Sequence, residues 1–371
     1  MEFEIAREEF QRALERVQGI VDKRNTIPLL ANVLIQTIPN GIKVTASDME
    51  IAFTGEYDAN VQTPGELTLG ARQLFEIVKN LPQDNVRLKR LDNDWMEITS
   101  GKAYFKIVGL SAEGYPAMPT MDGAVTLRIP AKSLKTMIEH TDFSIATDDS
   151  RYGLNGAYLE KLRAEEGGGI RMVSTDGHRL SLINQPLEGD VRMRDGYLLP
   201  RKGLAELKKL CDRFEGDVEV NFGDNGATFR NNRVVFFMRL LEGDFPDYRQ
   251  VVPGRFQRRL TLSRDELIKG LRRVAILSSE KTHSVRFRVT REGLEISASS
   301  PDLGESRELI DGTVEGEPMS VGFNARYFLD ALGVIGTDLI HLELGDSLHP
   351  AILKAQDRSD VMFVVMPMRL E

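Results

Sequence analysis

Asp176, Gly177 and His178 form the group in this sequence that comes nearest to acid–base chemistry. A carboxylate beside an imidazole can orient the ring for proton transfer. However, no candidate nucleophile lies near them in the sequence, and the spacing also fits a two-residue Asp-Gly hairpin turn between strands at 172–175 and 178–183. We therefore favour a structural or binding role for His178 and keep a hydrolase centred on Asp176 and His178 as an alternative.

The other reactive residue types form no further catalytic or metal-binding motif. The five histidines lack metal-ligand spacing, and Cys211 is the only cysteine, which excludes an intrachain disulfide and a multi-cysteine metal site. No phosphate-binding glycine loop, nucleophile elbow or paired-histidine zinc motif occurs. The glycines at 167–169 precede a strand-like segment rather than a helix, so they predict a hairpin tip. We expect no catalytic residue, metal or cofactor.

The chain ends in an apolar run, where most soluble proteins have polar and loosely held residues. Both alternating faces of 361–366 are apolar, so an extended strand here should be buried on both sides. Pro367 cannot donate a ladder hydrogen bond, so Met368, Arg369 and Leu370 should leave the sheet. Two compatible interpretations follow: 361–365 is a final core strand, and 366–370 lines a binding surface.

Six segments repeat one pattern, in which a short alternating strand and a break precede a helical periodicity. They begin at intervals of roughly 60 to 70 residues. The predicted helices are 8–17, 72–80, 132–141, 202–211, 265–274 and 326–334.

A second pattern recurs at about twice that spacing, an alternating strand that runs into a polar corner at 42–51, 170–179 and 294–303. The six units therefore pair into three domains, which we place at 1–122, 125–252 and 256–371. The predicted fold class is α+β, with three similar domains that each pack two helices on antiparallel β-sheet.

The composition is that of an ordinary globular protein, with 371 residues, 41% hydrophobic and 28% charged. No apolar run of about 20 residues occurs, and the N-terminus begins as a strand, so we expect neither secretion nor membrane insertion. The net charge of −8 argues against simple adsorption to nucleic acid, yet the predicted helices together are net positive. If they share one surface, it favours a polyanion; ordinary solvated charge is the alternative.

Three motifs together closely resemble the bacterial DNA polymerase sliding clamp family, the β subunit of the DNA polymerase III holoenzyme. They are Thr-Asp-Gly-His-Arg-Leu at 175–180, Phe-Pro-Asp-Tyr at 245–248 and Val-Met-Pro-Met-Arg-Leu at 365–370. The resemblance covers the whole chain. It implies a DNA-clamp fold that assembles head to tail into a homodimeric ring around duplex DNA, without sequence specificity. Such a ring is not an enzyme; it tethers the replicative polymerase and confers processivity.

The resemblance also implies partners and a location. The partners are duplex DNA, the catalytic subunit of the replicative DNA polymerase, the clamp loader, a second copy of the chain, and other DNA polymerases and repair proteins that carry clamp-binding peptides. The location is cytoplasmic and nucleoid-associated, which the single cysteine fits.

Site residues follow from the resemblance, position by position. The implied DNA-binding residues are Arg24, Arg151, Tyr152, Arg201 and Lys202. The implied dimer interface includes Phe105, Ile107, Ile276 and Leu277. The implied pocket for partner peptides comprises Leu154, Thr175, Gly177, His178, Arg179, Leu180, Pro246, Val251, Asn324, Tyr327, Val364, Val365, Met366, Pro367, Met368, Arg369 and Leu370. Apolar walls with adaptable methionines suit partners of differing sequence.

Several positions depart from the family pattern. Gly153 stands where some members have an aromatic residue, which weakens any stacking role for that loop. Gln250 and Thr282 replace an arginine and an aromatic of some members, and Glu371 extends beyond the usual terminal leucine. A peptide-docking scaffold that has lost DNA function therefore remains a further alternative.

Overall fold

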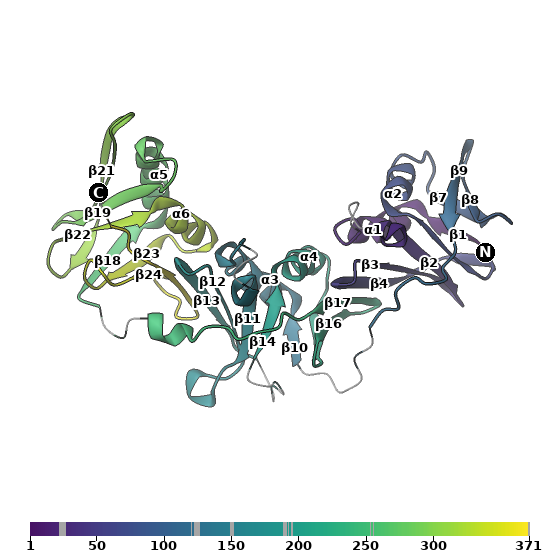
Figure 1. Cartoon of the computed structure of the whole chain (residues 1–371), viewed down its shortest axis with the longest axis horizontal. Coiled ribbons are helices and arrows are strands. Elements are labelled where there is room, and N and C mark those ends of the chain that lie inside the picture. The colour runs from purple at the N-terminus through teal and green to yellow at the C-terminus, as the bar shows by residue number, and fades with distance from the viewer. Residues whose placement is uncertain are drawn as a thin grey trace. The chain divides into compact units, whose positions relative to one another are not determined.

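The computed structural model describes residues 1–21, 27–119, 121, 127–148, 152–187, 191, 193, 196–252, 254 and 256–369. The chain forms two compact units (Figure 1). Unit 1 comprises Met1–Lys135 with Lys202–Leu240, and unit 2 comprises Thr136–Arg201 with Leu241–Glu371. The central third of the sequence therefore contributes to both units.

The first third of the chain begins with strand β1 and helix α1 and is otherwise rich in strands. Its elements are β1 (Glu2–Ala6), α1 (Arg7–Val17), η1 (Pro28–Ala31), β2 (Asn32–Ile38), β3 (Gly41–Ser47), β4 (Ile51–Asp58), β5 (Asn60–Thr63), β6 (Glu66–Gly70), α2 (Ala71–Lys79), β7 (Asn85–Arg90), β8 (Trp95–Ser100) and β9 (Ala103–Leu110).

The central third repeats the alternation of strands and helices. Its elements are β10 (Leu127–Pro130), α3 (Ala131–Glu139), η2 (Asp142–Ser144), η3 (Tyr152–Leu154), β11 (Gly156–Lys161), η4 (Ala164–Glu166), β12 (Ile170–Thr175), β13 (Arg179–Gln185), β14 (Tyr197–Pro200), α4 (Arg201–Cys211), β15 (Asp217–Phe222), β16 (Gly226–Asn231), β17 (Val234–Arg239) and η5 (Tyr248–Val251).

The last third follows the same plan and ends on a strand. Its elements are β18 (Arg258–Ser263), α5 (Arg264–Val274), η6 (Ala275–Leu277), β19 (Ser284–Val289), β20 (Gly293–Ser300), β21 (Gly304–Glu315), β22 (Met319–Asn324), α6 (Ala325–Val334), β23 (Leu339–Leu344), β24 (Ala351–Ala355) and β25 (Val361–Val365).

In unit 1 the described strands form a 13-stranded sheet in the order β10-β15-β16-β17-β4-β3-β2-β6-β9-β8-β7-β1-β5. Strand β17 pairs antiparallel with β4, from Val234 opposite Gly55 to Met238 opposite Ile51. Helices α1 and α2 pack on each other and on this sheet (Figure 1). The rings of Phe3 and Phe10 meet edge to face at 6.3 Å and anchor α1 to β1.

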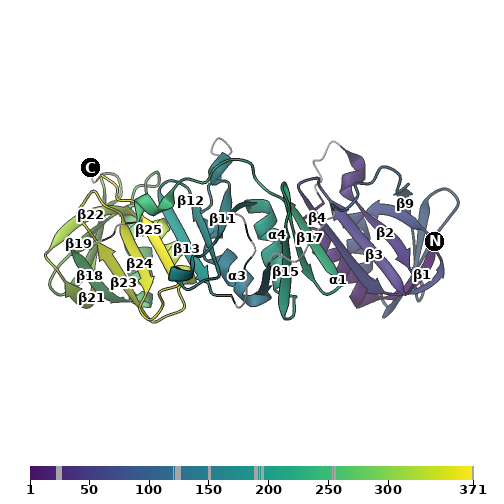
Figure 2. The ribbon, with the colours of Figure 1, turned by 90° about the horizontal axis from the view of Figure 1, so that it is seen from below.

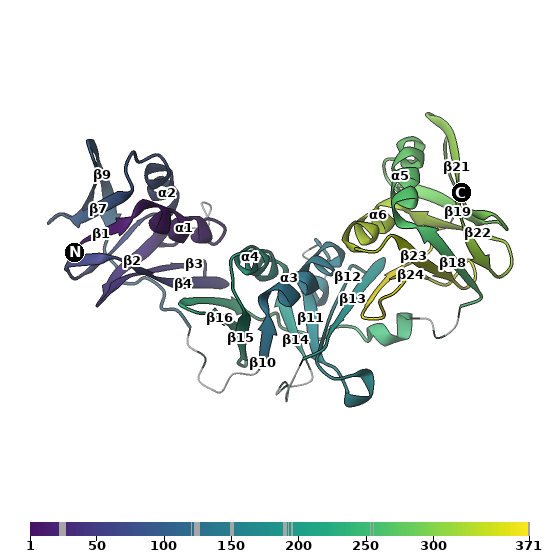
Figure 3. The ribbon, with the colours of Figure 1, turned by 180° about the vertical axis from the view of Figure 1, so that it is seen from behind.

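In unit 2 the described strands form a 12-stranded sheet in the order β14-β11-β12-β13-β25-β24-β23-β18-β21-β20-β19-β22. The terminal strand β25 lies between β13 and β24, as Figure 2 shows from below. Val365 is opposite Arg179 on one side and Ala351 on the other. Helices α5 and α6 pack on each other, α5 also on β20 and β21, and α6 also on β25 (Figure 3).

The six α-helices of the described residues match the predicted helices to within two residues at either end. Each has an apolar stripe; in α5 the buried residues are Leu267, Gly270, Leu271 and Val274, which helical spacing places on one face. Helix α5 is capped by Ser263, whose Oγ accepts a hydrogen bond from Glu266 N at 3.4 Å. The α+β prediction is thus confirmed.

The predicted two-residue turn at Asp176 and Gly177 is wrong in length. The last paired residues of β12 and β13 are Thr175 and Leu180, so four residues lie between them. The longer turn arises because the Asp176 carboxylate accepts hydrogen bonds from the backbone N of His178 at 2.9 Å and of Arg179 at 3.0 Å. The left-handed φ of 87° at Gly177 completes the turn.

Among the described residues, no helix is long and apolar enough to cross a bilayer. Within the same part of the chain, no cluster of three or more His, Cys, Asp or Glu side chains could hold a metal ion.

Candidate functional site

The turn between β12 and β13 is fixed by its own side chains. The Thr175 hydroxyl donates a hydrogen bond to the carbonyl of Arg179 at 2.7 Å and accepts one from Gly177 N at 3.1 Å. Together with the bonds to Asp176, these contacts occupy the polar groups of the turn. Gly177 and His178 consequently project as the exposed tip of a rigid loop.

Arg179 joins this turn to helix α6. Its Nε donates to the Asp176 carboxylate at 3.0 Å, its Nη1 donates to Asp330 at 2.5 Å, and its Nη2 donates to the carbonyl of Phe143. The guanidinium also lies over the rings of Tyr327, at 4.6 Å, and Phe143, at 5.4 Å. The Arg179 side chain is only 13% exposed, and it holds the turn against helix α6 and Phe143.

The wall contributed by α6 consists of Asn324 and Tyr327. Asn324 caps the helix, since its Oδ1 accepts a hydrogen bond from Arg326 N at 2.9 Å. The Tyr327 ring stacks with that of His178 at a centroid distance of 6.5 Å and an interplanar angle of 14°. Burial, followed by the Asp176 charge, raises the pKa of Tyr327. The tyrosine therefore stays a neutral aromatic surface at physiological pH.

The terminal strand ends where the sequence predicts, but Met368 does not leave the sheet as predicted, because it pairs with its end strand β22. Strand β25 ends at Val365, and Met366 N donates to the carbonyl of His178 at 2.9 Å. After Pro367, Met368 N donates to Gly322 O at 2.8 Å and forms an isolated bridge to β22. Met366, Pro367 and Met368 are each half-buried; the backbone of Met366 adjoins the turn, and that of Met368 adjoins β22, the strand that leads into α6.

The apolar floor of the site is part of the core. Leu180 is 3% exposed, and Val364 and Val365 are each 1% exposed. Leu180 and Val364 belong to a buried cluster that also contains Tyr248. These three residues therefore support the site from beneath and offer almost no surface to a ligand.

The segment at 241–252 packs on the floor of the site through Tyr248, and the predicted pocket residues Pro246 and Val251 on this segment are exposed. Phe245 stacks on Tyr158 of β11 at 5.2 Å. The Tyr248 hydroxyl donates to the buried Glu160 carboxylate, and Arg249 Nη2 reaches both oxygens of that carboxylate at 2.9 Å. A charge-assisted network thus holds this segment against the sheet.

Tyr248 makes unit 2 sensitive to alkali. Burial, followed by its hydrogen bond to Glu160, raises the pKa of Tyr248 to about 12 from the ordinary value of 10.0. The raised pKa means that the folded form keeps its full stability below pH 10, and that stability falls between pH 10 and 12. We expect the Tyr248 hydroxyl to lower the free energy of unfolding by roughly 2 to 3 kcal/mol over this range. Burial also raises the pKa of Tyr115 to about 12, so Tyr248→Phe should remove only the Tyr248 share of the fall. Urea unfolding between pH 10 and 12 measures this free energy for both proteins. If it falls equally steeply with pH in the wild type and in Tyr248→Phe, the raised pKa of Tyr248 is contradicted.

The remaining predicted pocket residues have the following places. Leu154 ends η3, is half-buried, and its carbonyl accepts a hydrogen bond from Ala146 N at 3.0 Å. Arg369 is exposed. Leu370, like Glu371, lies outside the described residues.

The predicted DNA-binding residues are only partly described. Arg24, Arg151 and the side chain of Tyr152 lie outside the described residues. Arg201 is exposed at the start of α4, and its backbone N donates to Asn155 O at 3.1 Å. Lys202 forms an ion pair with Asp48, whose side chain is only 3% exposed, so part of the lysine's charge is already neutralised.

The predicted interface residues differ in exposure. Phe105 is 37% exposed and Ile276 is 72% exposed, and Leu277 is half-buried. Ile107 is 6% exposed and packs into unit 1, so it offers little surface to a partner. Tyr104 and Val108, which the prediction omits, are 58% and 57% exposed on the same strand β9.

Sequence reasoning missed Phe143 and Asp330, which hold the guanidinium of Arg179. They lie 36 and 151 residues from it in the sequence. No spacing rule links positions so far apart, and a lone aspartate on an exposed helical face carries no signal of its own.

The fold defines a class of protein: an α+β protein of repeated strand–helix units whose terminal strand lies inside the sheet of unit 2. Models of the N-terminal, central and C-terminal domains of the DNA polymerase III beta subunit match residues 1–119, 128–247 and 249–369. The chain belongs to this family, the bacterial beta sliding clamps.

Individual relatives agree along the whole chain. The beta sliding clamp of Pseudomonas putida is 35% identical over 371 residues, covering 100% of both chains. The DNA polymerase sliding clamp of Bacillus subtilis superimposes with a TM-score of 0.95 at 28% identity, and the Pseudomonas aeruginosa clamp bound to griselimycin with 0.94 at 33%, each covering 100% of both chains. A member of this family is a processivity factor and not a catalyst, so the hydrolase alternative is set aside.

Proposed function

We propose that two copies of this chain close head to tail into a ring around duplex DNA. The ring slides without sequence specificity and tethers the replicative DNA polymerase, the clamp loader, other DNA polymerases and repair proteins through one pocket. Topology retains the ring on DNA, so its contacts with phosphates stay weak enough for sliding. Tethering raises the effective concentration of polymerase at the primer end, which gives processivity in the nucleoid.

The observation that carries the ring proposal is a pair of open strand edges. Among the described strands, residues 103–108 of β9 pair only with β8, and residues 304–311 of β21 pair only with β20. Open edges that carry exposed apolar side chains are sites of association. Pairing β9 of one copy with β21 of another is heterologous, and two such contacts close a ring.

The domain boundaries and the DNA contacts belong to the same proposal. We assign domains to 1–122, 125–252 and 256–371, which the three separate family matches support. For DNA we propose Arg24, Arg151, Tyr152, Arg201 and Lys202. Arg201 is the strongest described member, because it is exposed and makes no side-chain hydrogen bond or ion pair within the described residues.

The partner pocket is proposed around the tail, the turn at 175–180 and α6. The rigid turn and the stacked His178 and Tyr327 provide a preformed wall. The flexible side chains of Met366 and Met368 provide a second wall that can adapt to different peptides. Structures of two related clamps, from Pseudomonas aeruginosa and Bartonella birtlesii, are bound to griselimycin, which makes this compound a suitable probe.

The dimer interface gives a direct test. Phe105→Arg places a charge on the apolar edge of β9, so we expect the dimer dissociation constant to rise at least about a hundredfold. Sedimentation velocity measures the mass of this variant. The matched control is Leu348→Arg, which places the same charge at a residue that is 81% exposed and lies outside β9 and β21. Phe105→Arg should sediment as a monomer and the control as a dimer. A dimeric Phe105→Arg protein would refute the proposed interface.

A further inference from the structure

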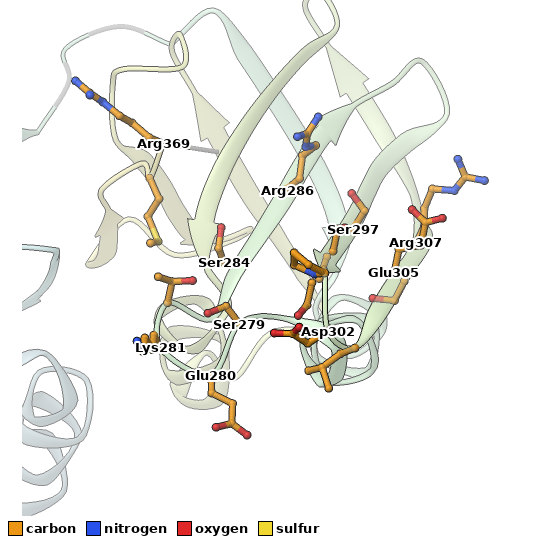
Figure 4. Close-up of a pocket in the computed structure, with 18 of the residues that line it drawn as sticks. Ser279, Glu280, Lys281, Ser284, Arg286, Ser297, Asp302, Glu305, Arg307 and Arg369 are labelled. Atoms are coloured by element: carbon orange, nitrogen blue, oxygen red, sulfur yellow. The ribbon is translucent and has the colours of Figure 1, made fainter. Parts of the chain in front are cut away.

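A polar hollow opens on the outer face of the sheet in unit 2, beside the tail. Its volume is about 1210 Å³, and it is lined by β19, β20, β21, Ser320 of β22, and Met368 and Arg369 of the tail. In Figure 4, Ser284 and Ser297 lie across its floor, Arg369 and Arg286 lie toward one end, and Glu280 and Asp302 lie toward the loop end. Serines, whose side chains are small, line much of the hollow, and arginines lie at one end of it.

Strand register connects this hollow to the proposed pocket. Met368 lies opposite Gly322, Gly322 opposite Arg286, Arg286 opposite Ser297, and Ser297 opposite Arg307. Residues directly opposite on antiparallel strands share a face, so these five positions form one row. Gly322 has no side chain, and nothing on β22 in this row therefore separates Met368 from Arg286.

The arginines of this row are available for an anion. The Arg286 side chain is exposed and makes no hydrogen bond or ion pair with the described residues. Arg288 and Arg307 both approach the single carboxylate of Glu295, at 3.6 and 3.9 Å. The hollow is lined by five basic side chains (Lys281, Arg286, Arg288, Arg307 and Arg369) and four acidic ones (Glu280, Glu295, Asp302 and Glu305), so its net charge is +1. Glu305 lies beside Arg307 (Figure 4), so Arg286 carries the positive charge that is least compensated in the row.

Resting on the proposed pocket, we propose that the hollow binds acidic residues that flank a partner's pocket-bound segment. Neighbouring strands lie about 4.8 Å apart, so Arg286 is about 10 Å and Arg307 about 19 Å from Met368 along the row. An extended chain advances about 3.3 Å per residue. If one partner residue contacts Met368, acidic residues roughly three and six positions further along the partner chain reach Arg286 and Arg307.

The test uses griselimycin conjugates on the full-length protein. Each conjugate carries a short Gly/Ser linker that ends in four aspartates or, as the matched probe, in four asparagines. Because exposed ion pairs are individually weak, we expect the aspartate conjugate to bind about three- to tenfold tighter at low salt. The advantage should disappear in about 1 M salt.

Variants locate the effect and separate it from the pocket. The double variant Arg286→Ser, Arg307→Ser should bind both conjugates equally, whereas Arg272→Ser, an exposed arginine on α5, should keep the preference. Because Arg307 lies on the edge proposed to pair with a second copy, sedimentation velocity should first show that the double variant is still a dimer. Unmodified griselimycin should bind all three proteins alike. Equal binding of both conjugates to the unchanged protein, as expected if a second copy covers this face, would overturn the inference. Failure of unmodified griselimycin to bind would instead overturn the proposed pocket.

Discussion

Deleting residues 366–371 should abolish binding of griselimycin and partner peptides and leave the dimer intact. The deletion removes Met366, which bonds the turn at His178, and Met368, which bonds Gly322 of β22, the strand that leads into α6. Strand β25 ends at Val365 and keeps its pairing with β13 and β24, so the sheet survives. Because a few central residues carry most binding energy, we expect affinity to fall at least about a hundredfold.

The matched control deletes only residues 370 and 371. It preserves the bonds of Met366 and Met368 to His178 and Gly322, so most of the affinity should remain. Isothermal titration with griselimycin measures the affinity, and sedimentation velocity measures the mass. A monomeric 366–371 deletion would show that the tail serves the subunit interface, and unchanged affinity would remove the tail from the pocket.

Replacing Arg179 with alanine should have the second largest effect. The guanidinium bridges Asp176 and Asp330 and reaches the carbonyl of Phe143. Its loss leaves Asp176, whose side chain is 18% exposed, without its strongest partner. Removing one member of a buried ion pair costs about 3 to 5 kcal/mol; because Asp330 is 45% exposed, we expect about 2 to 3 kcal/mol. The loosened turn should weaken griselimycin binding at least about tenfold.

Two variants control for charge and for shape. Arg326→Ala removes an exposed arginine from α6 and should change neither stability nor binding beyond about 0.5 kcal/mol. Arg179→Lys keeps the charge, yet a lysine cannot bond Asp176, Asp330 and Phe143 in one plane, so it should recover only part of the loss. Urea unfolding gives the stability. Wild-type stability and affinity in Arg179→Ala would contradict the role assigned to this residue.

The helices and the terminal strand were predictable because their signals are local. The apolar stripe of α5 and the alternation at 361–365 lie within a few residues of sequence. The partners of a strand are not local: β25 pairs with β13, about half the chain away, and β17 with β4. No alternation pattern identifies such pairings, so the sheets that continue from one predicted domain to the next could not be predicted.

The pocket was predictable as a set of residues and not as a surface. The motifs at 175–180 and 365–370 selected Leu180, Val364 and Val365, whose side chains are buried and support the floor. Burial depends on what packs above a side chain, here the cluster with Tyr248. Similarly, Ile107 alternates correctly for its strand but faces the core of unit 1, and Tyr104 and Val108 are exposed.

We propose that topology holds this protein on DNA. The direct measurement loads it onto a nicked circular duplex with its clamp loader, raises the salt to about 1 M to screen phosphate contacts, and then linearises the circle. A closed ring should stay on the circle and slide off the linear molecule. Retention after linearisation, or release from the intact circle by salt alone, would contradict it.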